Sequence, residues 1–379
     1  MLMRTIIANI IENFRIFKNI IKFSSKKIKI VFYSENKNYL KYSYLLIETF
    51  SKIYPNKILY ASSSKDDYID NLSVKNLYVG RGFFLQYFFL KIKANNFFLT
   101  TTDLGNSILK KTKNINRYIY YFHSAVSTLR AYTSKAFDNY DMILCNGDYQ
   151  VNEIKKRENL NNFKKKKLIK CGYLYFDYLK KNSNFNKKKN DEILIAPSWN
   201  YKEKNFINED FEKIIEKLLY YNYKVRFRPH PEHFKRSLVF LNRIKDKFNS
   251  ENFYYDDNIE NINSMERAKC LITDNSGIAI EFTLVLKKPT LYYESKNKIH
   301  NDEIKDYESL QSFEDTVKDY FGFKFKYDEI QTINKLIKYS ITRFKKEKIK
   351  KIDKFTKDNF FNMFNAINFV KKNIREILY

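Results

Sequence analysis

Short apolar runs alternate with amphipathic stretches along the first half of this chain. The runs are rich in β-branched and aromatic residues, and they predict buried strands over 27–34, 57–62, 76–80, 97–102, 118–124 and 141–147, followed by one more in LIKCGY (168–173). Apolar residues at helical spacing lie between several of these runs, most clearly over 40–54. Such strand–helix alternation is typical of a doubly wound α/β architecture.

A second alternation follows a polar, lysine-rich segment, which predicts a linker over 179–191. Strands are predicted over 192–198, 223–231, 253–257, 270–277 and 289–294, with helices over 211–221, 236–248, 259–268 and 278–286. The tail over 332–379 predicts two or more basic helices. We therefore predict an α/β protein with two Rossmann-type domains, 1–178 and 192–331, facing each other across a cleft. The C-terminal helices could cross back over the first domain.

The N-terminal residues have an amphipathic pattern. Apolar residues fall at helical spacing, at positions 6, 7, 10, 11, 14, 17, 20 and 21, with basic residues on the opposite face. Glu12, Asn13, Arg15 and Lys18 interrupt the apolar run, so it matches neither a signal peptide nor a transmembrane helix. Two interpretations stay open: the helix lies on a membrane surface, or it packs on its own protein.

The composition and net charge of the chain indicate which kinds of molecule it binds. With 379 residues, of which 44% are hydrophobic, the chain can build two cores. Its 70 Lys and Arg against 43 Asp and Glu give a formal net charge of +27. That surplus implies an anionic partner, which could be a nucleic acid, a phosphorylated polymer, a nucleotide substrate or an anionic membrane surface.

The cysteines and acidic residues do not suggest a metal site. Cys145, Cys171 and Cys270 lack the CxxC spacing of a zinc site and are interpreted as buried thiols of a reducing cytoplasm. No Asp-x-Asp dyad stands out, and Asp256–Asp257 is interpreted as a strand-end turn. We predict no metal.

The turn TDNSG predicts an anion site in the second half. It follows an apolar run and precedes a helix, whose first N–H groups have no partners within the helix and can bind phosphate. Asp274 or Ser276 could cap this helix, and Gly277 would let a phosphate approach the backbone. Glu281, one turn later, could accept hydrogen bonds from a ribose. The alternative is an ordinary capped helix without a ligand.

The segment FRPHP predicts a stiff loop that carries a histidine. Two prolines flank His230 and hold it extended, and Arg228 is a cation suited to bidentate phosphate contact. The alternative is a stiff loop with a partly exposed histidine. His233 and His300 are assigned no role.

Two further strand ends carry polar or aromatic side chains. His123 ends an aromatic strand, Ser124 follows it and a helix is predicted next. A neutral imidazole there could take a proton from an attacking hydroxyl, unless it is a core or capping histidine. Pro197, Ser198 and Trp199 follow the first strand of the second half. They could contact a base or a phosphate, or form a structural turn anchored by the indole.

Together these four motifs resemble the CDP-glycerol glycerophosphotransferase family, the teichoic-acid-type polymerases and primases of the GT-B class. The family's strand-end histidine, APTW, RPHP and TDYSS…D…KP patterns correspond here to His123-Ser124, APSW (196–199), RPHP (228–231) and TDNSG (273–277) with Glu281 and Lys288-Pro289. The resemblance covers roughly 118–294 and is strongest over 193–294. Four of the departures from the pattern matter most: Ser124 replaces glycine, Asn275 replaces tyrosine, and Gly277 and Glu281 replace serine and aspartate.

The resemblance implies transfer of a polyol phosphate, in the first place glycerol phosphate, from a CDP-activated donor to a hydroxyl of a surface-polymer or lipid-linked acceptor. CMP would leave, and no cofactor is needed. His123 would be the general base and His230 would stabilise phosphate charge. The donor would be held by Ser124, Pro197, Ser198, Trp199, Arg228, Thr273, Asp274, Asn275, Ser276, Gly277 and Glu281. Such an enzyme would work in the cytoplasm, peripheral to the inner face of the cell membrane.

Two other classes of protein remain as alternatives. A GT-B glycosyltransferase using a nucleotide sugar, in capsule or lipopolysaccharide synthesis, would need the same phosphate-binding turn. A nucleic-acid-binding protein would fit the charge, but the sequence has no RNP, zinc or helix-turn-helix signature, so no specific nucleic acid is expected.

Overall fold

The computed structural model describes residues 2–102, 104–183, 191–199, 207–258, 261–295, 299–307 and 311–379. The chain divides into two compact units. The first contains Met1–His123, Tyr132–Tyr178 and Phe360–Tyr379, and the second contains Ser124–Ala131 and Leu179–Asn359. The units therefore differ from the predicted domain ranges: Ser124–Ala131 belongs to the second unit, and the last twenty or so residues belong to the first.

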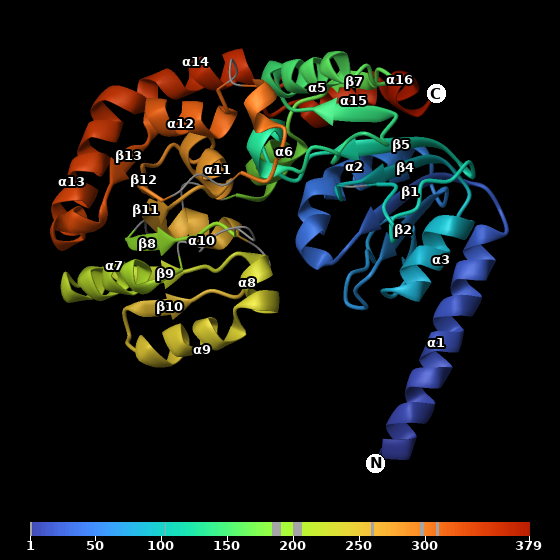
Figure 1. The fold of residues 1–379 in the computed structure, drawn as a ribbon, viewed down its shortest axis with the longest axis horizontal. Coiled ribbons are helices and arrows are strands. Elements are labelled where there is room, and N and C mark those ends of the chain that lie inside the picture. Colours follow the sequence, from blue (N-terminus) through green and yellow to red (C-terminus); the bar gives the residue numbers. More distant parts are fainter. Residues whose placement is uncertain are drawn as a thin grey trace. The chain divides into compact units, whose positions relative to one another are not determined.

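A seven-stranded parallel sheet forms the centre of the first unit (Figure 1), with the strand order β3-β2-β1-β4-β5-β6-β7. This is the order of a doubly wound Rossmann sheet. Strands β2 and β3 are added on one side of β1 and strands β4 to β7 on the other, so the sheet has a topological switch point between β1 and β4. The strands are β1 (Ile28–Ser34), β2 (Ile58–Ser62), β3 (Lys75–Tyr78), β4 (Ala94–Leu99), β5 (Ile115–Tyr121), β6 (Met142–Cys145) and β7 (Lys167–Lys170).

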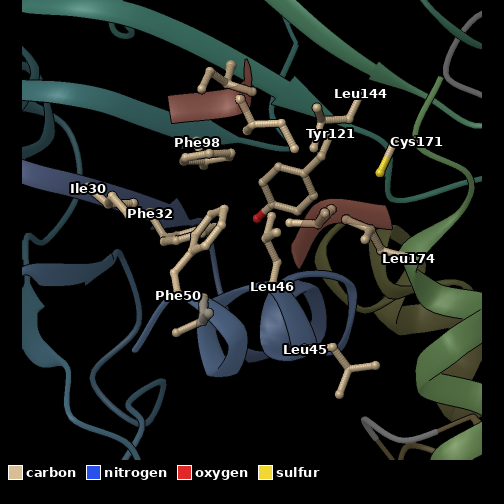
Figure 2. Packing of buried hydrophobic residues seen from close by; sticks show 14 of the residues in the cluster. Ile30, Phe32, Leu45, Leu46, Phe50, Phe98, Tyr121, Leu144, Cys171 and Leu174 are labelled. Atoms are coloured by element: carbon tan, nitrogen blue, oxygen red, sulfur yellow. The ribbon is translucent and has the colours of Figure 1, made fainter. Parts of the chain in front are cut away.

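Helices accompany this sheet: α1 (Leu2–Ser24), α2 (Leu40–Ile53), α3 (Phe83–Lys91), α5 (Asp148–Leu160), α6 (Leu174–Asn182, whose last residues enter the second unit), α15 (Ala366–Lys372) and α16 (Ile374–Leu378), with the 3-10 turn η1 (Lys37–Tyr39). Aromatic rings from strands and helix fill the core (Figure 2). Phe32 of β1 stacks on Phe98 of β4 with ring centroids 4.8 Å apart, and Phe50 of α2 lies 5.5 Å from Phe98. Ala366 and Val370 of α15 join the same cluster, so the C-terminal helices complete the first core.

The second unit repeats the same topology with six parallel strands in the order β10-β9-β8-β11-β12-β13. They are β8 (Glu192–Ile195), β9 (Lys224–Phe227), β10 (Phe253–Tyr255), β11 (Ala268–Thr273), β12 (Thr290–Tyr293) and β13 (Phe323–Phe325). The helices are α4 (Thr128–Ala131), α7 (Glu209–Tyr220), α8 (Pro231–Arg236), α9 (Leu238–Lys247), α10 (Ile262–Arg267), α11 (Ile278–Leu284), α12 (Phe313–Phe321), α13 (Ile333–Arg343) and α14 (Ile349–Asn359). Two short 3-10 helices are η2 (Ile304–Tyr307) and η3 (Tyr327–Thr332), and η4 (Phe344–Lys348) is a π-helical segment between α13 and α14. The predicted α/β class is confirmed.

Three local predictions need correction. The helix expected after His123 is only the single turn α4, because Ala125–Ser127 are buried as an irregular segment first. The expected linker begins inside α6, and residues 184–190 lie outside the described part of the chain. Strand β13 was not predicted, since three residues in the lysine-rich run GFKFKY carry too weak a pattern.

The N-terminal helix α1 has one packed face and one exposed apolar face. Ile16 and Ile20 are buried, and the ring of Phe17 lies 4.8 Å from that of Tyr87 on α3. Ile10 and Phe14 are 61% and 68% exposed. No helix in the described part of the chain has the length and apolarity that a membrane crossing requires.

Candidate functional site

The predicted site motifs lie at the carboxyl ends of the central strands of the second sheet. Strands β8 and β11 are neighbours, and the sheet reverses its direction of growth between them. APSW follows β8 and TDNSG ends β11, so both motifs flank this topological switch point. Ligands of doubly wound proteins bind at this point, where the two loops leave the sheet in opposite directions.

Asp274 joins the two loops. Its carboxylate accepts the backbone N–H of Ser198 at 2.7 Å and the hydroxyl of Ser198 at 2.6 Å, and both residues are buried. The hydroxyl of Thr273 donates to the carbonyl of Ala196 at 2.6 Å. These bonds fix the loop after β8 to the end of β11, with Pro197 buried between them.

The predicted cap of α11 is wrong. Gly277 is the N-cap residue, and no side chain of the described residues caps the helix, so neither Asp274 nor Ser276 does so. Asn275 donates to the hydroxyl of Ser295 at 3.2 Å, and Glu281 is buried within α11.

Gly277 is required for close packing and not for an unusual backbone. Its φ of −60° is helical, but a Cβ atom there would lie 2.7 Å from Oγ of Ser124 and 3.4 Å from Cγ1 of Val126. The space that was predicted for a phosphate is therefore shared with the segment that follows His123. The structure thus brings Ser124 and Gly277 into direct contact.

Arg228, at the end of β9, has a carboxylate partner. Its backbone N–H donates to Ile195, which aligns it with β8, and its guanidinium donates to Asp256 at 3.1 Å. Asp256 is buried and also accepts the hydroxyl of Ser264. The acidic pair interpreted as a strand-end turn therefore also anchors the predicted phosphate-binding cation.

His230 is the N-cap of α8, with Pro231 at the first helical position. Its Nδ1 accepts the backbone N–H of Glu232 at 3.2 Å. A backbone N–H can only donate, so Nδ1 must carry the lone pair, and the proton of the neutral ring lies on Nε2. The helix start therefore fixes His230 as a hydrogen-bond donor through Nε2.

His123, just after β5 in the first unit, is held in the opposite tautomer. Its Nδ1 lies 3.1 Å from the carbonyl oxygen of Thr100, which can only accept, so Nδ1 carries the proton. The Nε2 lone pair of the neutral ring is then the basic position. The rings of Tyr39, Tyr42 and Tyr132 contact the half-buried imidazole edge-on, with centroids 5.4, 6.1 and 6.2 Å away.

His233 is a site-supporting residue that the sequence interpretation missed. It is fully buried, and its Nε2 donates to the carbonyl of Ser198 at 3.1 Å while its ring meets that of Trp199 at 5.0 Å. It thus connects α8 to the APSW loop. The signal was present in the sequence, since His233 lies three residues after His230 and Pro231 starts a helix between them.

The part of this site that the structure describes gathers neither metal ligands nor reactive thiols. Among the described residues, no group of three or more His, Cys, Asp or Glu side chains is placed to hold a metal ion. The three cysteines are buried, and burial raises the pKa of Cys270 to about 12, so its thiol stays protonated at neutral pH.

Comparison with solved structures finds proteins of the same fold. The wall teichoic acid polymerase TagF is 17% identical, with a TM-score of 0.63 over 92% of this chain and 88% of that one. A TagF variant soaked with CDPG is 17% identical, with a TM-score of 0.60 over 98% and 95%. The Methanocaldococcus jannaschii UDP-GlcNAc 2-epimerase, solved with UDP-GlcNAc and UDP, is 14% identical, with a TM-score of 0.61 over 93% and 100%.

No family model and no curated protein matches the sequence. The structural likeness shows that this chain has the GT-B fold built from two Rossmann-type units, as predicted.

Proposed function

We propose that this protein transfers a polyol phosphate, glycerol phosphate in the first place, from a CDP-activated donor to a hydroxyl of a surface-polymer or lipid-linked acceptor. The observation that carries the proposal is the opposite kind of hydrogen-bond partner at Nδ1 of His123, a carbonyl, and at Nδ1 of His230, a backbone N–H. Phosphoryl transfer with an alcohol needs one group that removes a proton and others that stabilise phosphate charge. The GT-B fold shared with TagF, one structure of which was soaked with CDPG, supports the choice of donor.

In the proposed reaction, Nε2 of His123 takes the proton of the acceptor hydroxyl. The acceptor oxygen forms a bond to the phosphorus that carries the polyol, and the bond from that phosphorus to the bridging oxygen of CMP breaks. Nε2–H of His230 donates a hydrogen bond to a phosphate oxygen as its charge changes. CMP leaves with the electron pair of the broken bond.

The donor would be held by the loops at the switch point of the second sheet, between β8 and β11. Ser124, Ser198, Trp199 and the turn 273–277 surround the ends of β8 and β11, and Arg228 supplies a cation at the end of β9. Pro197 and Glu281 would shape this site from buried positions.

The substrate class is tested by incubating the purified protein with CDP-glycerol, CDP-ribitol and a panel of UDP-, GDP- and dTDP-sugars, each with and without an acceptor extract. The proposal expects acceptor-dependent CMP release from a CDP-polyol. Acceptor-dependent release of a nucleoside diphosphate from a nucleotide sugar would favour the second candidate, a GT-B glycosyltransferase. The shared fold with an epimerase solved with UDP-GlcNAc is the observation behind that candidate.

We also propose that the protein binds the inner face of the cell membrane through α1. Ile7, Ile10, Ile11 and Phe14 form its exposed apolar face, and the chain carries a net charge of +27. Apolar contact and attraction to anionic lipids together give an amphipathic helix its affinity for a membrane surface.

A further inference from the structure

The segment that immediately follows His123 is built into the second unit. The chain leaves the first unit between His123 and Ser124 and returns after Ala131. Ala125–Leu129 are all buried there, and Ser124 packs on Gly277 at the start of α11. The position of this segment is therefore set by the unit that carries the proposed donor site.

Polar groups from the region around α12 hold the backbone of this segment. Oε2 of Glu314, in the first turn of α12, accepts the N–H of Ser127 at 2.8 Å. The backbone N–H of His300 donates to the carbonyl of Arg130 at 2.7 Å, and its ring Nδ1 donates to the carbonyl of Ala131 at 3.2 Å. The guanidinium of Arg130 pairs with Asp315. Two adjacent acidic residues of one helix thus hold the segment at two points.

Glu314 occupies an unfavourable place for a carboxylate. Removal of its carboxyl group from water raises the pKa of Glu314 to about 7, against the opposing effect of the Ser127 N–H. A carboxyl group that is desolvated in this way loses hydration energy in its ionised form, and a specific hydrogen bond offsets part of that loss. The backbone N–H groups of Ser127 and of Glu314 itself donate hydrogen bonds that stabilise the ionised carboxylate in this way.

The geometry of His123 depends on both ends of a short connection. Strand β5 ends at Tyr121 and α4 begins at Thr128, and residues 122–127 belong to neither a helix nor a strand. Ser127, whose N–H Glu314 accepts, lies four residues after His123 in this irregular stretch. A shift of that anchor moves the backbone on which the imidazole is mounted.

We propose that Glu314 is a positioning residue: its hydrogen bond to Ser127 holds the segment 124–131 so that Nε2 of His123 is aimed at the acceptor hydroxyl. The inference rests on the proposed function of His123 as the base. Glu314 itself touches neither substrate nor reacting atoms in this account. It acts on the chemical step and not on donor binding.

The test compares three variants of the full-length protein. Glu314→Ala removes the acceptor of the Ser127 N–H, Glu314→Gln keeps an acceptor oxygen in the same place, and Asp319→Asn is the matched control, an exposed acidic residue on the same helix that pairs with Lys324. We expect Glu314→Ala to lower kcat by on the order of 10- to 100-fold, because small misplacements of a catalytic group have effects of this size. The donor KM should stay within about twofold of wild type.

The two other variants sharpen the interpretation. Glu314→Gln should keep kcat within about threefold of wild type, and Asp319→Asn should leave both constants unchanged. The proposal is overturned if Glu314→Ala has the same kcat as Asp319→Asn. It is also overturned if Glu314→Ala raises the donor KM and leaves kcat unchanged. If Glu314→Ala does not fold, the decision passes to Arg130→Met, which releases the segment at its ion pair with Asp315 and should show the same kcat-specific loss.

A second readout separates this proposal from the proposed function. The chain has four histidines, so ¹⁵N resonances of the rings can be assigned with one variant each. In the wild type, the His123 ring should report the Nδ1–H tautomer; in Glu314→Ala it should show mixed tautomers. If the wild type is inactive with every donor, the proposed function fails, and an unchanged His123 spectrum in Glu314→Ala separately refutes the positioning role.

Discussion

The direction of one hydrogen bond at Nδ1 distinguishes the two histidines of the proposed mechanism. The Thr100 carbonyl forces Nδ1 of His123 to donate, whereas the Glu232 N–H forces Nδ1 of His230 to accept. The same side chain therefore presents a lone pair at one position and a proton at the other. The sequence identified both residues, because each follows a strand, but it could not give their tautomers, since these depend on backbone partners.

Glu314 gives a pH dependence with a definite sign. Its pKa is raised from 4.5 to about 7 in the folded protein, so between these values the folded state holds a proton that the unfolded state has lost. Its contribution to stability is complete below pH 4.5 and is lost as pH rises through about 7.

We therefore predict that the free energy of unfolding of wild type, minus that of Glu314→Gln, falls by ~3 kcal/mol at most across this pH window. Urea unfolding of both proteins at a series of pH values measures the difference. The same subtraction with Asp319→Asn in place of Glu314→Gln serves as the control. A wild-type minus Glu314→Gln difference that stays flat with pH would show that the Glu314 carboxyl is not perturbed as described.

Among the elements, most strands were predicted and the irregular segments were not. Parallel strands buried on both faces read as continuous apolar runs, such as KIKIVFYS for β1 and CLIT for β11, so period and composition suffice to find them. The segment after His123 is also buried and apolar, yet it is irregular, and its backbone bonds to a side chain far along the chain in the same unit, Glu314. Such tertiary partners leave no local signal in the sequence.

The contact between Ser124 and α11 joins two departures from the family pattern. In the family pattern, a glycine follows the histidine and a serine stands at the start of this helix. In this chain the two residue types are swapped: Ser124 follows the histidine and Gly277 stands at the helix start. The structure places these two residues against each other.

Gly277→Ser alone should therefore destabilise the protein by roughly 1–3 kcal/mol through overpacking. Combined with Ser124→Gly, the same change should cost measurably less than the sum of the two single variants. Thermal unfolding of the four proteins in this cycle measures the coupling. Strict additivity would contradict direct packing of the two side chains.

On the scale of the whole molecule, two Rossmann-type sheets of the same strand order provide two switch points, and the chain connects the units at more than one place. The repeated strand–helix alternation predicted both sheets. The expectation that the C-terminal helices could cross back to the first half is met by 360–379. The change of unit at 124–131 was not predicted, because a sequence pattern marks elements and not the core they join.

The exposed face of α1 belongs to this scale as well. Replacing Ile10 and Phe14 by Ser removes two exposed apolar side chains without touching the buried Ile16 and Ile20. We expect the double variant to lose most of its co-sedimentation with anionic vesicles while its melting temperature stays unchanged, since only lipid contact is removed. Leu90→Ser, on α3, is a matched control for one exposed apolar side chain. Equal co-sedimentation of the double variant and the wild type would favour the alternative that α1 only packs on its own protein and does not bind membranes.

The most direct test of the mechanism is single-turnover CMP release from a CDP-polyol by His123→Asn and His230→Asn. Asparagine can still donate to the Thr100 carbonyl at 123 and can still cap α8 at 230, so each variant keeps the structural bond and loses only Nε2. Each should fold, bind the donor and react on the order of 10²- to 10⁴-fold more slowly than wild type. Turnover at a rate close to that of the wild type in either variant would contradict the assignment of that histidine.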